Sequence, residues 1–365
     1  MDDNIEIAKD FTVGDWKNLR EKLFEHDNYD AWTTAKNAFK NRINARFFDP
    51  IEKIKEGGLK TGEGFSITLI ASILLETFAA FELGRLYSSK STEIGPHQYS
   101  GSQILINDFF KKEFFKGLIS SKAKEKYFSF IRCPLVHEAK TDYRAIIIAN
   151  DGVKNIKPME FFFKVEGKDE FRLNRDLFVD VLKNFFEDYL KRLMEPSNIH
   201  LRNSFIMKFD EISGINHCWY FVYGSNLNNK QLNDRLSELK TGLLQEFSCS
   251  TDGYSFKYNK RSKDGTAKAN LVKENSGVVN GKAVLLDKDS FKKFMDDKEK
   301  GYESEEITVS YFASEKNKIF KCFTAISSNL TTAAPSREYV KTIIDGANEN
   351  NLPDDYIAKF INYPF

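Results

Sequence analysis

The sequence predicts a multidomain protein of the α and α+β classes, with a mainly helical N-terminal half and a mixed α/β C-terminal half. At 365 residues, the chain is longer than a single hydrophobic core usually supports. Up to about residue 200 the apolar residues recur at helical spacing. After that point, short β-prone runs alternate with helical segments. We therefore expect a helical domain over residues 1–200, a connector over 201–217 and a second domain over 218–365.

In the N-terminal half, the first clear helix carries apolar residues three and four positions apart: Trp32, Ala35, Phe39, Ile43 and Phe47. We expect it to end near Asp49 and Pro50. Residues 65–87 are apolar on almost every face, which is typical of a central buried helix. A third helix is predicted around 104–118. A long fourth one follows Asn174 or Asp176, either of which could cap it. Two short runs at 145–148 and 161–165 read as a small β insertion.

In the C-terminal half, a strand is predicted to end at Tyr223, and further strands are expected at 278–286, 307–312 and 318–325. Helices are expected at 227–240, 287–293 and 337–350. The polar stretch 251–268 reads as a long loop. About 150 residues is an ordinary size for one domain.

Composition limits the classes of function. Lys+Arg 54 against Asp+Glu 53 gives a formal net charge of +1, so global charge does not indicate a nucleic-acid-binding protein. The four cysteines show neither a disulfide framework nor zinc-ligand spacing. The acidic start differs from a signal peptide, and residues 65–87 contain too many charges to span a bilayer comfortably. These features predict a cytoplasmic protein without a membrane partner.

The junction Tyr223-Gly224-Ser225-Asn226-Leu227 joins an apolar strand to a helical pattern. Backbone N–H groups at a helix start lack intrahelical partners and suit a carboxylate or phosphate. Gly224 allows a ligand to approach the backbone, and Ser225 or Asn226 can cap the helix. An ordinary strand–turn–helix junction with a good cap explains the same residues.

Other segments match this junction in order and rough spacing. They are Ala269-Asn270-Leu271, Val279-Asn280-Gly281, Met295-Asp296-Asp297-Lys298-Glu299, Ala334-Pro335-Ser336-Arg337-Glu338-Tyr339, and the run from Gly346 to Pro353. Together with residues 221–227 they resemble the γ-glutamylcyclotransferase family over nearly all of residues 218–365. The resemblance implies a barrel-like mixed α/β fold. It also shows two departures, because Asn280 stands where relatives carry an aromatic residue and Tyr302 is out of register with a family tyrosine.

The resemblance implies that the α-amine of a small γ-glutamyl substrate attacks the substrate's own γ-carbonyl and releases 5-oxoproline. No metal or organic cofactor is required. The family's essential glutamate falls on Glu299, the expected acid/base. The backbone of 223–227 would hold the substrate's α-carboxylate, and Tyr339 would orient the substrate. Without the resemblance, Glu299 lies in a charged run that is typical of a solvated turn.

In the N-terminal half, Arg132 and His137 are separated by four residues and follow an aromatic stretch. They resemble the Arg-x(4–6)-His motif of HEPN domains, which are small helical bundles. The resemblance implies metal-free RNA cleavage across a homodimer, with His137 moving a proton, Arg132 stabilising phosphorane charge and Glu76 helping to position them. Cys133 departs from the motif, and a purely structural role for the Arg/His pair explains it as well.

The sequence therefore predicts a γ-glutamylcyclotransferase-like enzyme with a HEPN-like helical domain as its dimerisation element. An alternative is an HEPN-type ribonuclease toxin or defence protein that binds RNA, with the C-terminal domain as its sensor. A catalytically silent interaction protein is the third hypothesis.

Overall fold

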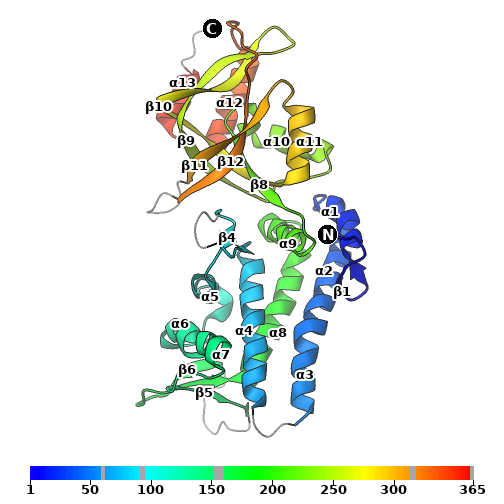
Figure 1. Ribbon diagram of the computed structural model, residues 1–365, viewed down its shortest axis with the longest axis vertical. Coiled ribbons are helices and arrows are strands. Elements are labelled where there is room, and N and C mark those ends of the chain that lie inside the picture. The colour runs from blue at the N-terminus through cyan, green and yellow to red at the C-terminus, as the bar shows by residue number, and fades with distance from the viewer. Residues whose placement is uncertain (59–61, 91–94, 151–159, 312–317, 362–365) are drawn as a thin grey trace. The chain divides into compact units, whose positions relative to one another are not determined.

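The computed structural model describes residues 1–58, 62–90, 95–150, 160–311 and 318–361. The chain divides into two compact units (Figure 1). The helical unit comprises Met1–Leu19, His26–Ser89 and Gln98–Lys208, and the barrel unit comprises Arg20–Glu25, Lys90–His97 and Phe209–Phe365.

Up to residue 212 the chain is mainly helical. The elements are, in order, β1 (Glu6–Ala8), β2 (Phe11–Thr12), α1 (Val13–Leu23), α2 (Tyr29–Ile43), the π-helical η1 (Asn44–Phe48), α3 (Asp49–Glu56), α4 (Glu63–Glu82), β3 (Leu86–Tyr87), β4 (Gln98–Tyr99), α5 (Ser102–Phe110), the 3-10 turn η2 (Glu113–Phe115), α6 (Ser121–Tyr127), the π-helical η3 (Phe128–Arg132), α7 (Cys133–Glu138), β5 (Ala145–Ile148), β6 (Phe162–Lys164), β7 (Phe171–Asn174), α8 (Arg175–Leu193) and α9 (Ile199–Ile212).

The long helices follow the predicted periodicity, with one difference at Pro50. The apolar segment around residue 75 is the buried helix α4, which lies beside α8 (Figure 1). The cap of α8 is Asn174, whose Oδ1 accepts hydrogen bonds from the N–H groups of Asp176 and Leu177. We expected the first helix to end near Asp49 and Pro50, but the chain passes through η1 into α3 without leaving the helix. Proline is tolerated there because the first turn of a helix needs no N–H donor at that position.

Aromatic side chains fill the core of the helical unit, in line with the 33 phenylalanines of the chain. The Phe39 ring stacks on Phe81 with centroids 4.4 Å apart and meets Phe186 edge-on at 5.2 Å. Stacked and edge-to-face pairs add to the free energy of burial. The small sheet has the order β5-β7-β6, and its third strand, β7, was not predicted.

Helix α4 is long and apolar enough to cross a membrane by length and composition alone. A buried core helix of a soluble protein passes the same test. Its side chains Ile67, Leu74 and Leu75 are fully buried inside the helical unit.

The barrel unit is built on five strands. Its elements are β8 (His217–Val222), the 3-10 turn η5 (Ser225–Leu227), α10 (Asn229–Glu238), β9 (Gln245–Arg261), β10 (Ala267–Asp287), α11 (Lys288–Lys298), β11 (Glu303–Tyr311), β12 (Lys318–Ile326), α12 (Arg337–Glu349) and α13 (Asp354–Ile361). The strands close into a barrel in the order β10-β8-β12-β11-β9. β8 runs antiparallel to β10 and parallel to β12.

Two predictions about this part of the chain were wrong. The polar stretch 251–268, expected as a loop, contains most of β9, the turn and the start of β10; the register of this hairpin pairs Tyr258 with Ala269 and Thr251 with Val279. Polar residues on the outer face of a barrel strand made that stretch look like a loop. The stretch 201–217, expected as a connector, contains most of α9, and the division between the two units falls between Lys208 and Phe209.

Candidate active site

Strand β8 delivers the Tyr223–Leu227 junction to one end of the barrel. Residues Cys218–Val222 are buried, and β8 lies between β10 and β12. The Tyr223 hydroxyl, just past the strand, donates to the carbonyl oxygen of Ala325. At Gly224 a Cβ atom would lie 3.2 Å from the Cβ of Ala269 and 3.5 Å from the Tyr339 hydroxyl, so a side chain there would crowd the space above the strand.

The junction itself is a 3-10 turn, and the capping prediction for it was wrong. Ser225–Leu227 closes through the Leu227 N–H to the Gly224 carbonyl, at 2.9 Å. Helix α10 starts only afterwards, and its cap is Asn228, whose side chain accepts from the Gln231 N–H. The extra turn leaves Asn226 free to serve a different group. The N–H groups of Ser225 and Asn226, the first of the turn, have no acceptor within it.

Helix α12 holds the turn in place. A Cβ at Gly346 would lie 2.2 Å from the Asn228 nitrogen and 2.4 Å from the Leu227 carbonyl carbon, so only glycine permits this close approach. Asn350 Nδ2 donates to the Leu227 oxygen at 2.7 Å. The Glu349 carboxylate accepts from the Asn229 N–H at 2.8 Å. The C-terminal segment around Gly346 therefore positions the junction from the back.

Glu299 lies at the C-terminal end of α11 and faces the junction. It is 8% exposed, and its Oε1 accepts a 2.6 Å hydrogen bond from Asn226 Nδ2. Arg235 Nη1 lies 3.4 Å from the same oxygen. Burial raises the pKa of the Glu299 carboxyl, and this effect exceeds the opposing effects of Arg235, the Asn226 hydrogen bond and Lys260.

A cavity lies in front of this carboxylate and contains about 290 Å³ of space unfilled by protein atoms, including solvent at its opening. Its walls come from β8, β10 and β12, the junction, the segment between α11 and β11, and α12. The lining residues are Tyr220, Val222, Tyr223, Gly224, Ser225, Asn226, Ala269, Glu299, Tyr302, Ala325 and Tyr339. Glu299, Tyr339 and four of the five junction residues thus meet in one place. The remaining one, Leu227, is fully buried behind the turn.

Two tyrosine hydroxyls form hydrogen bonds with the backbone of Ala269 in the cavity wall. The Ala269 N–H donates to the Tyr339 hydroxyl at 3.1 Å, and the Tyr302 hydroxyl donates to the Ala269 carbonyl oxygen at 2.6 Å. Burial raises the pKa of Tyr339 to about 12 and that of Tyr302 further, so both phenols are neutral near pH 7. The sequence comparison set Tyr302 aside as out of register, yet its side chain lines the cavity. Asn280 is not among the described residues that line the cavity. It pairs with Ser250 on β9.

Sequence reasoning missed Gln231 and Arg235. They lie four residues apart on α10 and so project from one face. Gln231 Nε2 donates to the Ser225 hydroxyl at 2.9 Å, and Arg235 Nη1 donates to Asn226 Oδ1 at 2.8 Å. The available signal was a polar i, i+4 pair directly beside the apolar stripe of Leu232 and Leu236 on α10.

The residues singled out in the helical unit are only partly brought together. Arg132 Nη2 lies 3.0 Å from Glu76 Oε2, and the Ser102 hydroxyl donates to Glu76 Oε1 at 2.6 Å. His137, on the short helix α7, is exposed. The structure thus places Glu76 with Arg132, and it shows no hydrogen bond from His137 to either of them within the described chain.

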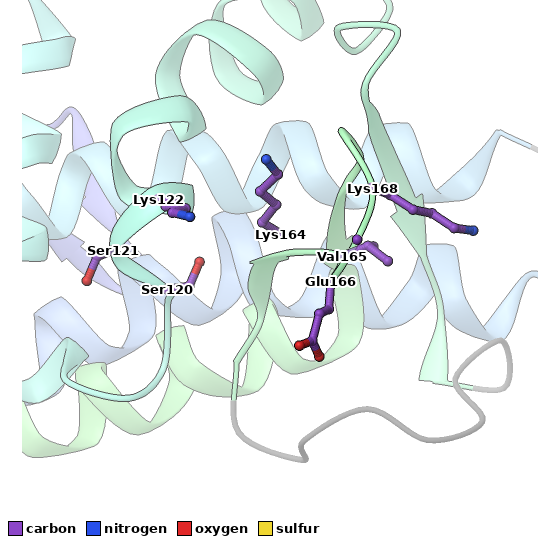
Figure 2. Close-up of a pocket in the computed structure, with 8 residues that line it drawn as sticks. Ser120, Ser121, Lys122, Lys164, Val165, Glu166 and Lys168 are labelled. Carbon is purple, nitrogen blue, oxygen red and sulfur yellow. The ribbon is translucent and has the colours of Figure 1, made fainter.

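The helical unit also has a shallow hollow between the start of α6 and the turn after β6 (Figure 2). Ser120, Lys122 and Lys164 face it from its two sides, together with Ser121, Val165, Glu166, Gly167 and Lys168. All the lysines are exposed. Across the described part of the chain, no group of three His, Cys, Asp or Glu side chains is arranged to hold a metal ion.

Comparison with known proteins gives one family. Residues 286–360 match the AIG2-like family, a segment from the end of β10 to α13 that includes Glu299 and Tyr339. No curated protein matches the chain. The match lies outside the helical unit, so the HEPN-like assignment of that unit stays a prediction.

Solved structures with similar chains include a gamma-glutamyl cyclotransferase, which is 21% identical with a TM-score of 0.36 over 41% of this chain and 89% of the other. An uncharacterized human protein is 22% identical, with a TM-score of 0.35 over 40% and 88% of the two chains. The Bacillus subtilis protein YkqA is 17% identical, with a TM-score of 0.35 over 42% and 56%. The family match supports an AIG2-like fold in the C-terminal region, over residues 286–360.

Proposed function

We propose that the barrel unit is a γ-glutamylcyclotransferase, which converts a γ-glutamyl amine or γ-glutamyl amino acid into 5-oxoproline and a free amine. The observation that carries the proposal is the position of Glu299. A buried carboxylate with a raised pKa lines the same cavity as residues 223–226 of the junction. A carboxylate in a solvated turn would have neither property.

Binding is the first requirement. In the proposed complex, the substrate's α-carboxylate lies against the N–H groups of Ser225 and Asn226, which have no acceptor within their own turn. The neutral hydroxyl of Tyr339 contacts the glutamyl group. The limited space of the cavity favours a folded substrate, in which the α-nitrogen approaches the γ-carbonyl carbon.

Proton transfer is the second requirement. Glu299 takes a proton from the α-ammonium group, and the freed amine attacks the γ-carbonyl carbon to form the new C–N bond. Glu299 delivers this proton to the leaving nitrogen as the original amide C–N bond breaks. It then takes the second proton that the attacking nitrogen loses in forming the lactam and passes it to the released amine, which leaves as an ammonium ion. A carboxyl whose pKa is raised towards neutrality suits both directions of transfer. No net proton is consumed by the carboxylate.

The proposal is tested by incubating the full chain with a panel of γ-glutamyl amino acids and γ-glutamyl amines. We expect equal amounts of 5-oxoproline and freed amine. The matched control is the same substrate with its α-nitrogen acetylated, which binds through the same carboxylate but has no nucleophile. Failure to release 5-oxoproline from every member of the panel, or equal release from the acetylated control, would overturn the proposal.

The ribonuclease hypothesis for the helical unit remains a second prediction, and one observation bears on it: Glu76 contacts Arg132 as that hypothesis expected. RNA cleavage by the full chain that is lost in both Arg132→Ala and His137→Ala would support it. A homodimer, RNA as a partner and a cytoplasmic location also stay predictions.

A further inference from the structure

A chain of polar contacts connects α10 to Glu299 through Asn226. It starts on α10, where Arg235 Nη1 and Gln231 Nε2 both donate to Asn226 Oδ1, at 2.8 and 3.3 Å. With its oxygen engaged by two donors, the Asn226 amide must direct its Nδ2 group towards Glu299. The orientation of Asn226 therefore depends on α10.

The two oxygens of the Glu299 carboxylate have different surroundings. Oε1 accepts from Asn226 Nδ2 at 2.6 Å and from Arg235 Nη1 at 3.4 Å. Oε2 accepts no hydrogen bond from any residue that the structure describes. Since Glu299 lines the cavity, Oε2 is the oxygen available to a ligand.

The groups that face Glu299 come from several elements and include two cations. They are Arg235 of α10, Lys260 of β9, Tyr220 and Tyr223 at the end of the β8 strand, Tyr302 after α11, and Tyr339 of α12. The Lys260 ammonium donates to the Lys300 carbonyl oxygen at 3.0 Å and lies over the Tyr302 ring. Arg235 is thus the cation in direct contact with the carboxylate.

We infer that Arg235 is a positioning residue for Glu299: together with Asn226 it fixes Oε1 and leaves Oε2 to exchange protons with the substrate. The inference rests on the proposed function and deepens it, because it identifies which carboxylate oxygen acts and what holds it. The positive charge of Arg235 also favours the ionised form of Glu299, which is the form that accepts the first proton.

The test is the pH dependence of kcat/KM for 5-oxoproline release in Arg235→Gln and Arg235→Met. Both variants remove the charge from a side chain that is 31% exposed, so the fold should tolerate them. We expect the acid limb of the profile to move to higher pH, so that the loss of kcat/KM on the acid side is about tenfold larger than on the plateau. Arg235→Lys keeps the charge and should keep the limb near its parental position while lowering the plateau.

The matched control is Lys230→Gln, which removes the same charge from the same helix at a side chain that is 85% exposed and paired with Asp234. It should leave the profile unchanged. A uniform loss in both neutral Arg235 variants, with the limb unmoved, would show a merely structural role and overturn the inference.

A second readout needs no substrate and separates this inference from the proposed function. We compare the melting temperatures of proteins with and without Glu299→Gln across pH, once in the parental background and once in the Arg235→Gln background. Without the Arg235 cation, this difference in melting temperature should keep increasing up to a higher pH than in the parental background. If the parent releases no 5-oxoproline but the difference shifts in this way, the contact stands and the enzyme proposal fails; if the difference does not shift, the inference fails.

Discussion

The molecule contains two glutamate–arginine pairs, Glu76 with Arg132 and Glu299 with Arg235. They differ in how many of the carboxylate oxygens accept a hydrogen bond. In the helical unit both oxygens of Glu76 are engaged, Oε1 by Ser102 and by Tyr99 at 3.2 Å, and Oε2 by Arg132. In the barrel unit, among the described residues, only Oε1 of Glu299 is engaged. A carboxylate with both oxygens bonded is suited to holding elements together, whereas one with a free oxygen in a cavity can act on a ligand.

Burial separates the pairs further. The side chains of Glu76 and Arg132 are 17% and 21% exposed, so the acid and the cation are buried to a similar degree. The Glu299 side chain is 10% exposed and the Arg235 side chain 31% exposed, so in the barrel pair the carboxylate is buried while the cation stays partly exposed. The comparison teaches that an Arg–Glu contact alone does not identify a site; the accessibility of the second carboxylate oxygen does.

The largest expected effect is on catalysis. Glu299→Gln keeps an acceptor for Asn226 but cannot take up or return a proton. We expect the rate of 5-oxoproline release to fall by about 10²- to 10⁴-fold, the usual contribution of a positioned acid/base. Glu76→Gln is the matched control and should release 5-oxoproline at the parental rate. Parental activity in Glu299→Gln would contradict the acid/base role assigned to Glu299.

The next effect concerns the support of the junction. Gly346→Ala places a Cβ within 2.4 Å of two backbone atoms of the 227–228 peptide, which must move. We expect a loss of about 1–3 kcal/mol in the free energy of unfolding, measured by urea titration, although alanine normally stabilises a helix interior. The same variant should release 5-oxoproline more slowly.

Gly101→Ala is the control for this variant, because a Cβ there meets nothing within 4 Å. A stabilised Gly346→Ala protein would mean that α12 does not press against the junction as described.

A smaller effect is the pH dependence of stability. Burial raises the folded-state pKa of Glu299 above its unfolded value of about 4.3. Below the unfolded-state pKa, the carboxyl is protonated in both the folded and the unfolded protein. As the pH rises from there through the folded-state pKa, the parent protein loses stability, because the buried carboxyl is harder to ionise than the exposed one. The melting temperature of Glu299→Gln relative to the parent should therefore rise as the pH increases from about 4 through the folded pKa. A difference that stays constant with pH would show that the carboxyl titrates normally.

The smallest effect belongs to the other pair. Glu76→Gln removes the charge that faces Arg132 and should lower stability near pH 7 by at most about 1 kcal/mol, since both side chains are partly exposed. Its sign at that pH should be opposite to that of Glu299→Gln, which is measurable in the same thermal scans. Stabilisation by Glu76→Gln would remove the contrast between the two pairs.

Much of the fold could be predicted from periodicity, because α4, α8 and β8 carry uninterrupted apolar patterns and Asn174 is a strong cap. The β9–β10 hairpin could not be predicted in this way. Its outward-facing polar residues give the sequence pattern of a loop, and only the closed barrel shows that the strands have a buried inner face. The helical break at Pro50 was wrong for a local reason, because proline is harmless in the first turn of α3.

The candidate site was predictable where a motif marked it. Glu299, Tyr339 and the junction were singled out from the sequence, and the structure places all of them except Leu227 around one cavity. Tyr302 and Arg235 were not, because their roles depend on distances between α10, α11 and the β10 strand that no local pattern records. Asn226 was expected as a helix cap and instead bonds Glu299, because η5 adds a turn before α10.

The central claim is that Glu299 is the group that moves the proton, and the pH profile of kcat/KM for 5-oxoproline release tests it most directly. The parent should show an acid limb above the ordinary range of a glutamate carboxyl, because burial raises the pKa of Glu299. The residual activity of Glu299→Gln should lack that limb. A limb that persists unchanged in Glu299→Gln would contradict the account, because another group would then carry the proton.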